Sequence, residues 1–242
     1  MGSPLPRIDQ QAAFLLHSVP YRESSLIVDL FTREHGRIAA VAKGARRPHS
    51  ALRGVLLQFQ PLLAGWTGRS ELRTLTAAQW VGGLANPQGD ALLCAFYLNE
   101  LLMKMLPRED PYPGLYAAYA QALRELGEGA PLDDTLRRFE WLLLRETGYA
   151  PDLDCDTDDA PIDPARHYHW QPSAGFAVAE PGSEGRGGAL VSGETLQSLA
   201  AGSFDSPRAR TQAKYLTRAI LAHHLDGAVL NTRQILIDLH KL

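Results

Sequence analysis

The sequence predicts an α+β protein in which a small β barrel precedes a helical domain. Residues 12–80 contain five short apolar runs of strand length, separated by turns with glycine. After Trp80 the apolar residues recur at helical spacing, and residues 149–190 interrupt that spacing. We therefore expect a disordered extension at 1–10, a barrel domain at 11–82, and a helical domain at 83–242 with a loop and hairpin insertion at about 149–190.

The first eighty residues alternate apolar runs with turns. Gly36 and Gly68 supply the positive φ that a tight reversal needs, and Pro61 is expected to bend the fourth run, which is long for one strand. Five strands within about 70 residues have the size of an OB-fold barrel, and a small open sandwich is the alternative. The runs are residues 12–17, 25–32, 37–43, 54–66 and 72–80.

Start and stop signals predict the helices. Asp90 caps the first, which Pro107 ends, and Pro113 opens the second. The third is capped by Asp133 or Asp134, ends at Gly148 and is apolar on most sides, which predicts the centre of a bundle. The expected helices are 90–106, 113–126, 135–147, 192–201, 206–224 and 232–240, and a hairpin is expected from 166–170 and 175–179.

The charge is unevenly distributed along the chain. The total is −3, from 24 basic and 27 acidic residues, which by itself argues against a nucleic-acid binder. Residues 1–80, however, hold ten Lys and Arg against five Asp and Glu, and residues 208–242 hold six against two. Residues 81–207 hold eight against twenty. The near-neutral total therefore hides two basic blocks around an acidic one.

Signatures of enzymes are missing from the sequence. It contains no phosphate-binding P-loop, no G-x-G-x-x-G, no G-x-S-x-G and no H-E-x-x-H, so we expect no catalytic site and no cofactor. A hydrolase with a spatially assembled site remains an alternative. Two cysteines, no apolar run of membrane-spanning length and no signal-peptide core predict a cytoplasmic protein without a membrane segment.

An acidic stretch at 152–159 raises two possibilities for metal binding. Its aspartates have the spacing of a calcium loop, but Thr157 stands where such a loop has glycine, so a solvated loop is favoured. A zinc site would use Cys155, Asp158, His167 and His169, without any C-x-x-C pair, and the alternative is two exposed histidines on a hairpin. We expect no metal site.

The basic segments are stronger signals. The loop at 43–50 carries three cations, and such a barrel can follow a phosphate backbone while Phe59 or Trp66 stacks a base. Loop cations that are merely solvated are the alternative. Arg210, Lys214 and Arg218 form a stripe on one helix face, which either meets an anion or exposes its charge to solvent.

The third helix offers a mixed face. Arg138, Trp141, Leu142 and Arg145 are spaced 0, +3, +4 and +7, which places an apolar centre between two cations. Such a face fits a short peptide with carboxylates and an aromatic residue, and arginine stems lying over a core are the alternative.

Several segments, in this order and spacing, resemble the RecO family of bacterial recombination mediators. They are Phe14-Leu-Leu-His17, Tyr21-Arg-Glu-Ser-Ser25, Leu30-Phe-Thr32, Gly36-Arg37, Val41-Ala-Lys-Gly-Ala-Arg46, Ser50-x-Leu52-x-Gly54, Leu57-Gln-Phe59, Leu98-Asn-Glu-Leu-Leu102, Leu136-Arg-Arg-Phe-Glu140, Leu143-x-x-x-x-Gly148-Tyr149 and Leu230-Asn-Thr-Arg233. The resemblance spans nearly the whole chain and is weakest over 150–205.

The resemblance implies an N-terminal OB-fold, binding of single- and double-stranded DNA, strand annealing without catalysis, and loading of RecA, together with RecR, onto DNA coated by single-strand-binding protein (SSB). It also implies that the helical domain docks the acidic, Phe-ended tail of SSB. Many members carry a four-Cys zinc module after the third helix. Here Cys155 occupies the first ligand position, Asp158 stands at the second and the later pair is absent, so the chain resembles the zinc-free branch.

We therefore expect a DNA-binding mediator that is nucleoid-associated and monomeric when free, and the alternative is a protein–protein adaptor whose barrel binds a protein partner. The expected DNA contacts are Arg22, Lys43, Arg46, Arg47, Arg53, Arg69, Arg73, Arg210, Lys214 and Arg218. The expected SSB-tail contacts are Arg138, Trp141, Leu142 and Arg145.

Overall fold

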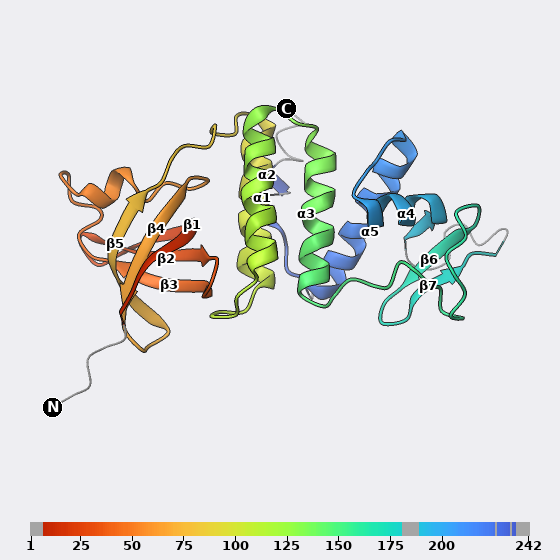
Figure 1. Cartoon of the computed structure of the whole chain (residues 1–242), viewed down its shortest axis with the longest axis horizontal. Coiled ribbons are helices and arrows are strands. Elements are labelled where there is room, and N and C mark those ends of the chain that lie inside the picture. Colours follow the sequence, from red (N-terminus) through yellow and green to blue (C-terminus); the bar gives the residue numbers. More distant parts are fainter. Residues whose placement is uncertain (1–6, 181–188, 226, 233, 236–242) are drawn as a thin grey trace. The chain divides into compact units, whose positions relative to one another are not determined.

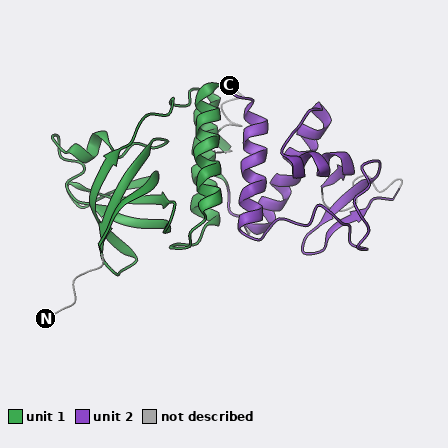
Figure 2. Ribbon diagram, viewed as in Figure 1, with its two compact units in different colours: residues 1–129, 230–242 green, residues 130–229 purple. Residues whose placement is uncertain are grey.

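The computed structural model describes residues 7–180, 189–225, 227–232 and 234–235. The chain forms two compact units, residues 1–129 with 230–242 and residues 130–229 (Figure 2). The first two helices belong to the same unit as the barrel, so the expected domain boundary at 82/83 falls inside that unit.

Five strands close into a barrel in the order β1-β2-β3-β5-β4 (Figure 1). The predicted five-stranded barrel is confirmed, and the open sandwich is wrong because pairing of β3 with β5 and of β1 with β4 leaves no open edge. The β3–β5 pair is parallel and the other neighbouring pairs are antiparallel. The strands are β1 (Arg7–Tyr21), β2 (Ser25–Thr32), β3 (Gly36–Ala42), β4 (Pro61–Thr67) and β5 (Leu72–Trp80).

Two sequence-based boundaries of the barrel are corrected. Residues 7–10, assigned to the disordered extension, lie in β1, where Arg7 pairs with Thr67; residues 1–6 lie outside the described part of the chain. The run at 54–66 is extended only from Pro61. A 3-10 helix, η1 (Ala51–Gly54), and the positive φ of Phe59 precede it, and the first position of a strand tolerates the missing amide of proline.

The barrel packs against the hairpin of α1 (Asp90–Met105) and α2 (Pro113–Glu128). Phe14 lies 5.1 Å from Tyr119, between ring centroids, in an edge-on contact. Asn99 Nδ2 donates a hydrogen bond of 2.8 Å to the carbonyl oxygen of Leu16. A Cβ on Gly36 would lie 2.0 Å from the carbonyl oxygen of Asp110, so only glycine allows the loop after α1 to approach β3 this closely.

The second unit contains α3 (Leu132–Glu146), α4 (Gly193–Ala201) and α5 (Pro207–His224). Helix α3 is amphipathic rather than apolar on most sides, and it buries Arg137 and Glu140. The predicted hairpin is confirmed as β6 (His167–Gln171) and β7 (Gly175–Val178), and β8 (Leu190–Ser192), which the sequence did not predict, pairs with the other edge of β6.

Local signals set most helix boundaries, although Gly89 rather than Asp90 is the N-cap of α1 and Pro131 that of α3. Of the helix expected at 232–240, residues 232, 234 and 235 are helical, and Arg233 and residues 236–240 lie outside the described residues. Within the described chain, no helix combines the length and hydropathy needed to cross a membrane.

Candidate nucleic-acid interface

Strand register brings separate segments together at one end of the barrel. Because β3 and β5 run parallel, their C-terminal ends lie at the same end. Leu26 at the start of β2 pairs with Ala42 at the end of β3, so the β1–β2 turn lies there too. Trp80 at the end of β5 pairs with Leu62, which places the start of β4 at this end. We call this the basic end, formed by residues 21–25, 43–54, 61–62 and 80.

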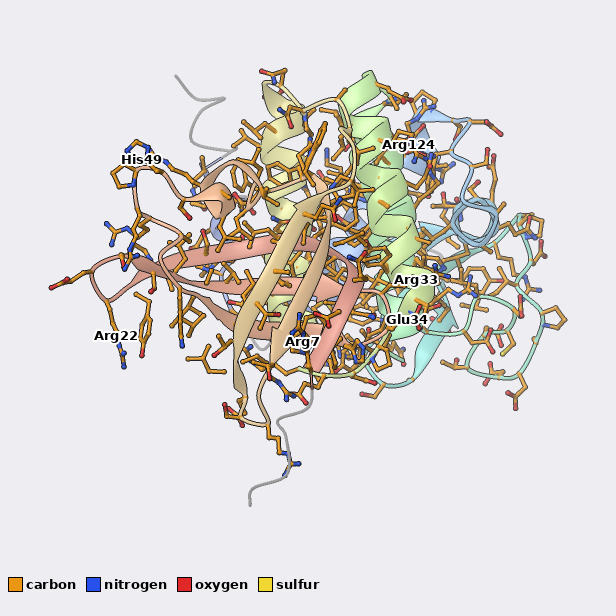
Figure 3. The ribbon with its side chains drawn as sticks, turned by 60° about the vertical axis from the view of Figure 1, so that its left-hand side comes forward. Arg7, Arg22, Arg33, Glu34, His49 and Arg124 are labelled. Atoms are coloured by element: carbon orange, nitrogen blue, oxygen red, sulfur yellow. The ribbon has the colours of Figure 1, made fainter. Side chains whose placement is uncertain are left out.

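Five of the expected DNA contacts lie at the basic end. Lys43, Arg47 and Arg53 are exposed and form no ion pair with any described residue. Glu23 is the one acidic residue in segments 21–25 and 43–54. Figure 3 shows Arg22 and His49 at this end. A surface with five cations and a single carboxylate is suited to an anionic partner. The five cations are Arg22, Lys43, Arg46, Arg47 and Arg53.

Backbone contacts hold the cationic loop against the β1–β2 turn. Gly44 has a φ of +70°, which turns the chain after β3. The amide of Arg46 donates to the carbonyl oxygen of Ser24 at 2.9 Å, and Arg46 Nη1 donates to that of Glu23 at 3.4 Å. The guanidinium carbon of Arg22 lies 5.1 Å from the ring centroid of Tyr21. The cations of the two turns are therefore kept together by the backbone that carries them.

The opposite end of the barrel is electrically balanced. Arg33 lies 3.3 Å from Glu34 in the β2–β3 turn, between Nε and Oε1. Arg69 and Glu71 share the β4–β5 turn. Arg73 is half-buried there, where its guanidinium lies 2.7 Å from a carboxylate oxygen of Glu109. The structure therefore separates Arg69 and Arg73 from the five expected DNA contacts at the basic end, because Arg69 lies in the β4–β5 turn and Arg73 at the start of β5.

The two aromatic residues expected to stack a base are buried, so that expectation is wrong. Trp66 is 2% exposed in the barrel core, and Phe59 is 5% exposed. Phe59 packs edge-on against Phe96 of α1, with 4.9 Å between ring centroids. Trp80, which was not predicted as a contact, is 51% exposed at the basic end. Its position as the last residue of an expected strand, before a glycine-rich linker, was the available signal.

The basic stripe of α5 meets acidic residues. Arg210 Nε lies 3.0 Å from Asp134 Oδ1, and Lys214 Nζ lies 2.9 Å from Asp133 Oδ1. Burial disfavours the charged form of Asp133. The hydrogen bond from Lys214 and the charges of Lys214, Arg137 and Arg218 outweigh burial, so the pKa of Asp133 lies below its ordinary value. The first turn of α3 thus neutralises two cations of the stripe.

The expected peptide face on α3 is only partly exposed. Arg138 and Arg145 are exposed, Leu142 is half-buried and Trp141 is buried. On another side of the helix, Arg137 pairs with Glu140, whose Oε2 accepts a hydrogen bond of 2.7 Å from Thr217 on α5. Two cations therefore flank a mostly covered apolar centre.

An aspartate of the acidic stretch at 152–159 accepts hydrogen bonds from nearby backbone amides. Asp156 Oδ1 accepts hydrogen bonds from the amides of Asp158 and Ala160, at 2.9 and 3.0 Å. Desolvation and the charge of Asp152 raise the pKa of the Cys155 thiol, the opposite of the shift that favours a thiolate ligand. Among the residues described, no three His, Cys, Asp or Glu side chains are grouped as metal ligands.

The histidines of β6 are not both exposed. His169 is buried, which corrects the reading of two exposed histidines on a hairpin. Nε2 of the half-buried His167 lies 2.5 Å from Nη2 of Arg208. The two histidines are two residues apart in β6 and therefore share one face of the strand, as expected. That face is buried or half-buried rather than exposed.

Comparisons with known proteins identify the family of the chain. A family model for the N-terminal region of recombination protein O matches residues 8–84, and one for its C-terminal region matches residues 86–234. The chain belongs to the RecO family. Family membership gives the chain a function in DNA repair and recombination, and its closed barrel is the OB-fold domain of the family.

Curated relatives cover almost the whole chain. A DNA repair protein RecO of Ralstonia nicotianae is 51% identical over 236 residues, covering 98% of this chain and 86% of the relative. Proteins of the same name from Polynucleobacter asymbioticus and Azoarcus sp. are 50% and 49% identical over 242 and 238 residues, covering 98% of each chain.

Proposed function

We propose that this chain is a DNA-binding recombination mediator whose basic end contacts the phosphates of DNA. The observation that carries the proposal is the separation of charge between the two ends of the barrel. One end holds five cations against Glu23, and the turns at the other end balance Arg33 and Arg69 with Glu34 and Glu71. Contacts to phosphates do not depend on the base sequence of the DNA. A mediator that acts at any damaged site needs such sequence-independent binding.

The mediator acts by bringing strands together and involves no catalysis or cofactor. Cations that follow the phosphates of two complementary strands reduce their repulsion, and base pairing then completes annealing. Membership of the RecO family, whose curated relatives are named DNA repair proteins, supports this role. We extend it to action with RecR in loading RecA onto SSB-coated strands, by a chain that is monomeric when free and located at the nucleoid.

For the acidic, Phe-ended tail of SSB, we propose a dock on α3. The exposed guanidinium groups of Arg138 and Arg145 would pair with the carboxylates of the tail, and the half-buried Leu142 lies between them. Trp141 is 6% exposed and supports this face from below rather than contacting the peptide broadly.

Charge reversal at the two ends of the barrel tests the DNA-binding proposal. We expect Lys43→Glu/Arg46→Glu/Arg47→Glu to abolish tight binding of a labelled single-stranded oligonucleotide, measured by fluorescence anisotropy over a range of salt concentrations. The slope of log K against log salt is negative. Each lost phosphate contact makes it less steep by about 0.7 for single strands, so the loss of three makes it less steep by about 2. Annealing of complementary oligonucleotides is expected to slow in parallel.

The matched control reverses three exposed cations at the other end, Arg7→Glu/Arg33→Glu/Arg69→Glu. It makes the same change in net charge and is expected to bind DNA much more tightly than the basic-end variant. Equal affinities of the two variants would contradict the assignment of the interface. A wild-type chain without salt-dependent binding to oligonucleotides would instead favour the adaptor.

A further inference from the structure

We propose that Trp80 is a base-stacking residue that makes the basic end selective for unpaired DNA. The inference rests on the proposed DNA binding and adds the form of DNA that this end prefers. Five cations at one end of the barrel explain attraction to any phosphate backbone, whether single- or double-stranded. They give no reason for an aromatic side chain to be exposed at the same end of the barrel.

Trp80 differs from every other tryptophan of the chain in its exposure. It is 51% exposed, whereas Trp66, Trp141 and Trp170 are 2%, 6% and 6% exposed. The neighbouring Val81 is 57% exposed, so the apolar surface continues past the end of β5. An exposed indole next to a second exposed apolar residue marks a binding surface more often than an isolated apolar side chain does.

The linker that follows β5 passes beside the indole of Trp80, and Gln60 holds that linker in place. A Cβ added to Gly83 would lie 3.3 Å from Cζ2 of Trp80, so the linker passes beside the edge of the indole. Gln60, 5% exposed, holds that linker: its Nε2 donates to the carbonyl oxygen of Leu84 at 2.9 Å, and its Oε1 accepts from the Leu84 amide at 3.2 Å. The indole thus rests against a pinned backbone with half of its surface open.

The register places this ring at the same end of the barrel as the cations. Trp80 pairs with Leu62 at the basic end, the same end as the β1–β2 turn and the segment 43–54. A strand whose phosphates follow these cations can therefore present a base to the ring. Of the occupants that an exposed indole could take, the positive charge of this end of the barrel favours a nucleic acid over an apolar peptide.

The chemistry of stacking selects the form of DNA. Bases within a duplex are already stacked on their neighbours and offer no free face, whereas an unpaired base has a free π-face for the indole. Trp80 therefore strengthens binding of single strands and adds little to binding of duplex DNA. A chain that anneals strands needs such a preference for the substrate over the product.

The test compares Trp80→Ala and Trp80→Phe with Tyr215→Ala, which removes an aromatic side chain that is 64% exposed on α5, as a control. Each full-length variant is titrated with a labelled oligo-dT and with a duplex of equal length at one salt concentration. We expect Trp80→Ala to weaken single-strand binding at least about fivefold, the lower end for one base stacked on an aromatic ring. Duplex affinity should stay unchanged, and Trp80→Phe should retain most of the single-strand affinity.

Intrinsic fluorescence gives an independent readout. Because the other three tryptophans are buried, oligo-dT should quench mainly the emission of Trp80, and Trp80→Phe should remove that quenching. Equal single-strand affinity of the wild type and Trp80→Ala, or an equal loss for both DNA forms, would overturn the inference and leave the basic end intact. A wild-type chain that binds neither form would overturn the proposed function as well.

Discussion

Lys214 on α5 lies 2.9 Å from Asp133 in the first turn of α3, and Arg210, one helical turn earlier, lies 3.0 Å from Asp134. Two cations on one helix thus meet two adjacent carboxylates on another. The two carboxylates also lie at the N-terminus of α3, where the positive end of the helix dipole stabilises negative charge. A basic stripe that can attract DNA when considered alone is largely neutralised inside the folded unit.

We therefore expect Arg210→Ala/Lys214→Ala to leave DNA affinity and its salt dependence unchanged. The double variant loses two partly exposed ion pairs, which contribute at most about 1 kcal/mol each, so its unfolding midpoint in urea should fall slightly. Fluorescence anisotropy and urea unfolding on the same preparation check both expectations. If the double variant lost as much DNA affinity as the Lys43→Glu/Arg46→Glu/Arg47→Glu variant, α5 would be part of the DNA interface.

A second prediction concerns the proposed dock for the SSB tail. Arg138→Glu and Arg145→Glu should each weaken binding of a short acidic peptide ending in Phe, because each places a carboxylate against the carboxylates of the peptide, while DNA affinity is unchanged. The control Arg124→Glu reverses an exposed cation on α2. Fluorescence anisotropy measures the peptide affinity of the three variants. Equal affinities would show that the dock does not lie on α3.

Trp141 is expected to act differently from the arginines that flank it. Because its side chain is buried, Trp141→Ala should lower the free energy of unfolding by about 3–5 kcal/mol through lost packing. A loss of peptide binding in that variant is therefore informative only when the folded fraction is measured alongside, for example by circular dichroism.

A third prediction concerns Glu100, which holds the start of the C-terminal segment against α1. Its Oε1 accepts from the amide of Asn231 at 2.9 Å, and its Oε2 accepts from the amide and hydroxyl of Thr232 at 3.0 and 2.6 Å. Burial disfavours the charged carboxylate. The hydrogen bonds from Thr232 and Asn231 and the charge of Lys104 outweigh burial, so the pKa of Glu100 lies below its usual range.

Glu100→Gln should lower the free energy of unfolding by roughly 1 kcal/mol, because the amide lacks the charge and replaces one acceptor oxygen with a donor. A lowered folded-state pKa contributes stability above the unfolded pKa of about 4.3 and loses it as the pH falls through the folded value. The difference between wild type and variant should thus be full at pH 7 and shrink below about pH 4. Urea unfolding across this range measures it, with the exposed Glu128→Gln as control. A difference independent of pH would show that the charge of Glu100 is not its cause.

Local sequence signals predicted most elements of the fold. The runs at 25–32 and 72–80 are strands β2 and β5 with the expected limits, because branched and aromatic residues bounded by turns favour extended chain. Pro107 and Gly148 lie just beyond the helices that they were expected to end. The strand at β8 was missed because three residues carry too little periodicity to be recognised without their partner on β6.

The sequence by itself determined the family, the order of barrel and helices, and the unequal distribution of charge, because periodicity, turns and motif order are local properties of a chain. Only the tertiary structure decided which charges are available. Lys43, Arg47 and Arg53 stay exposed at one end of the barrel, whereas Lys214 meets Asp133 on another helix. The same division holds for the aromatic residues, where Trp66 fills the core and Trp80 lies at the surface. Pairing and burial depend on contacts between residues far apart in the chain, and only folding brings those residues together.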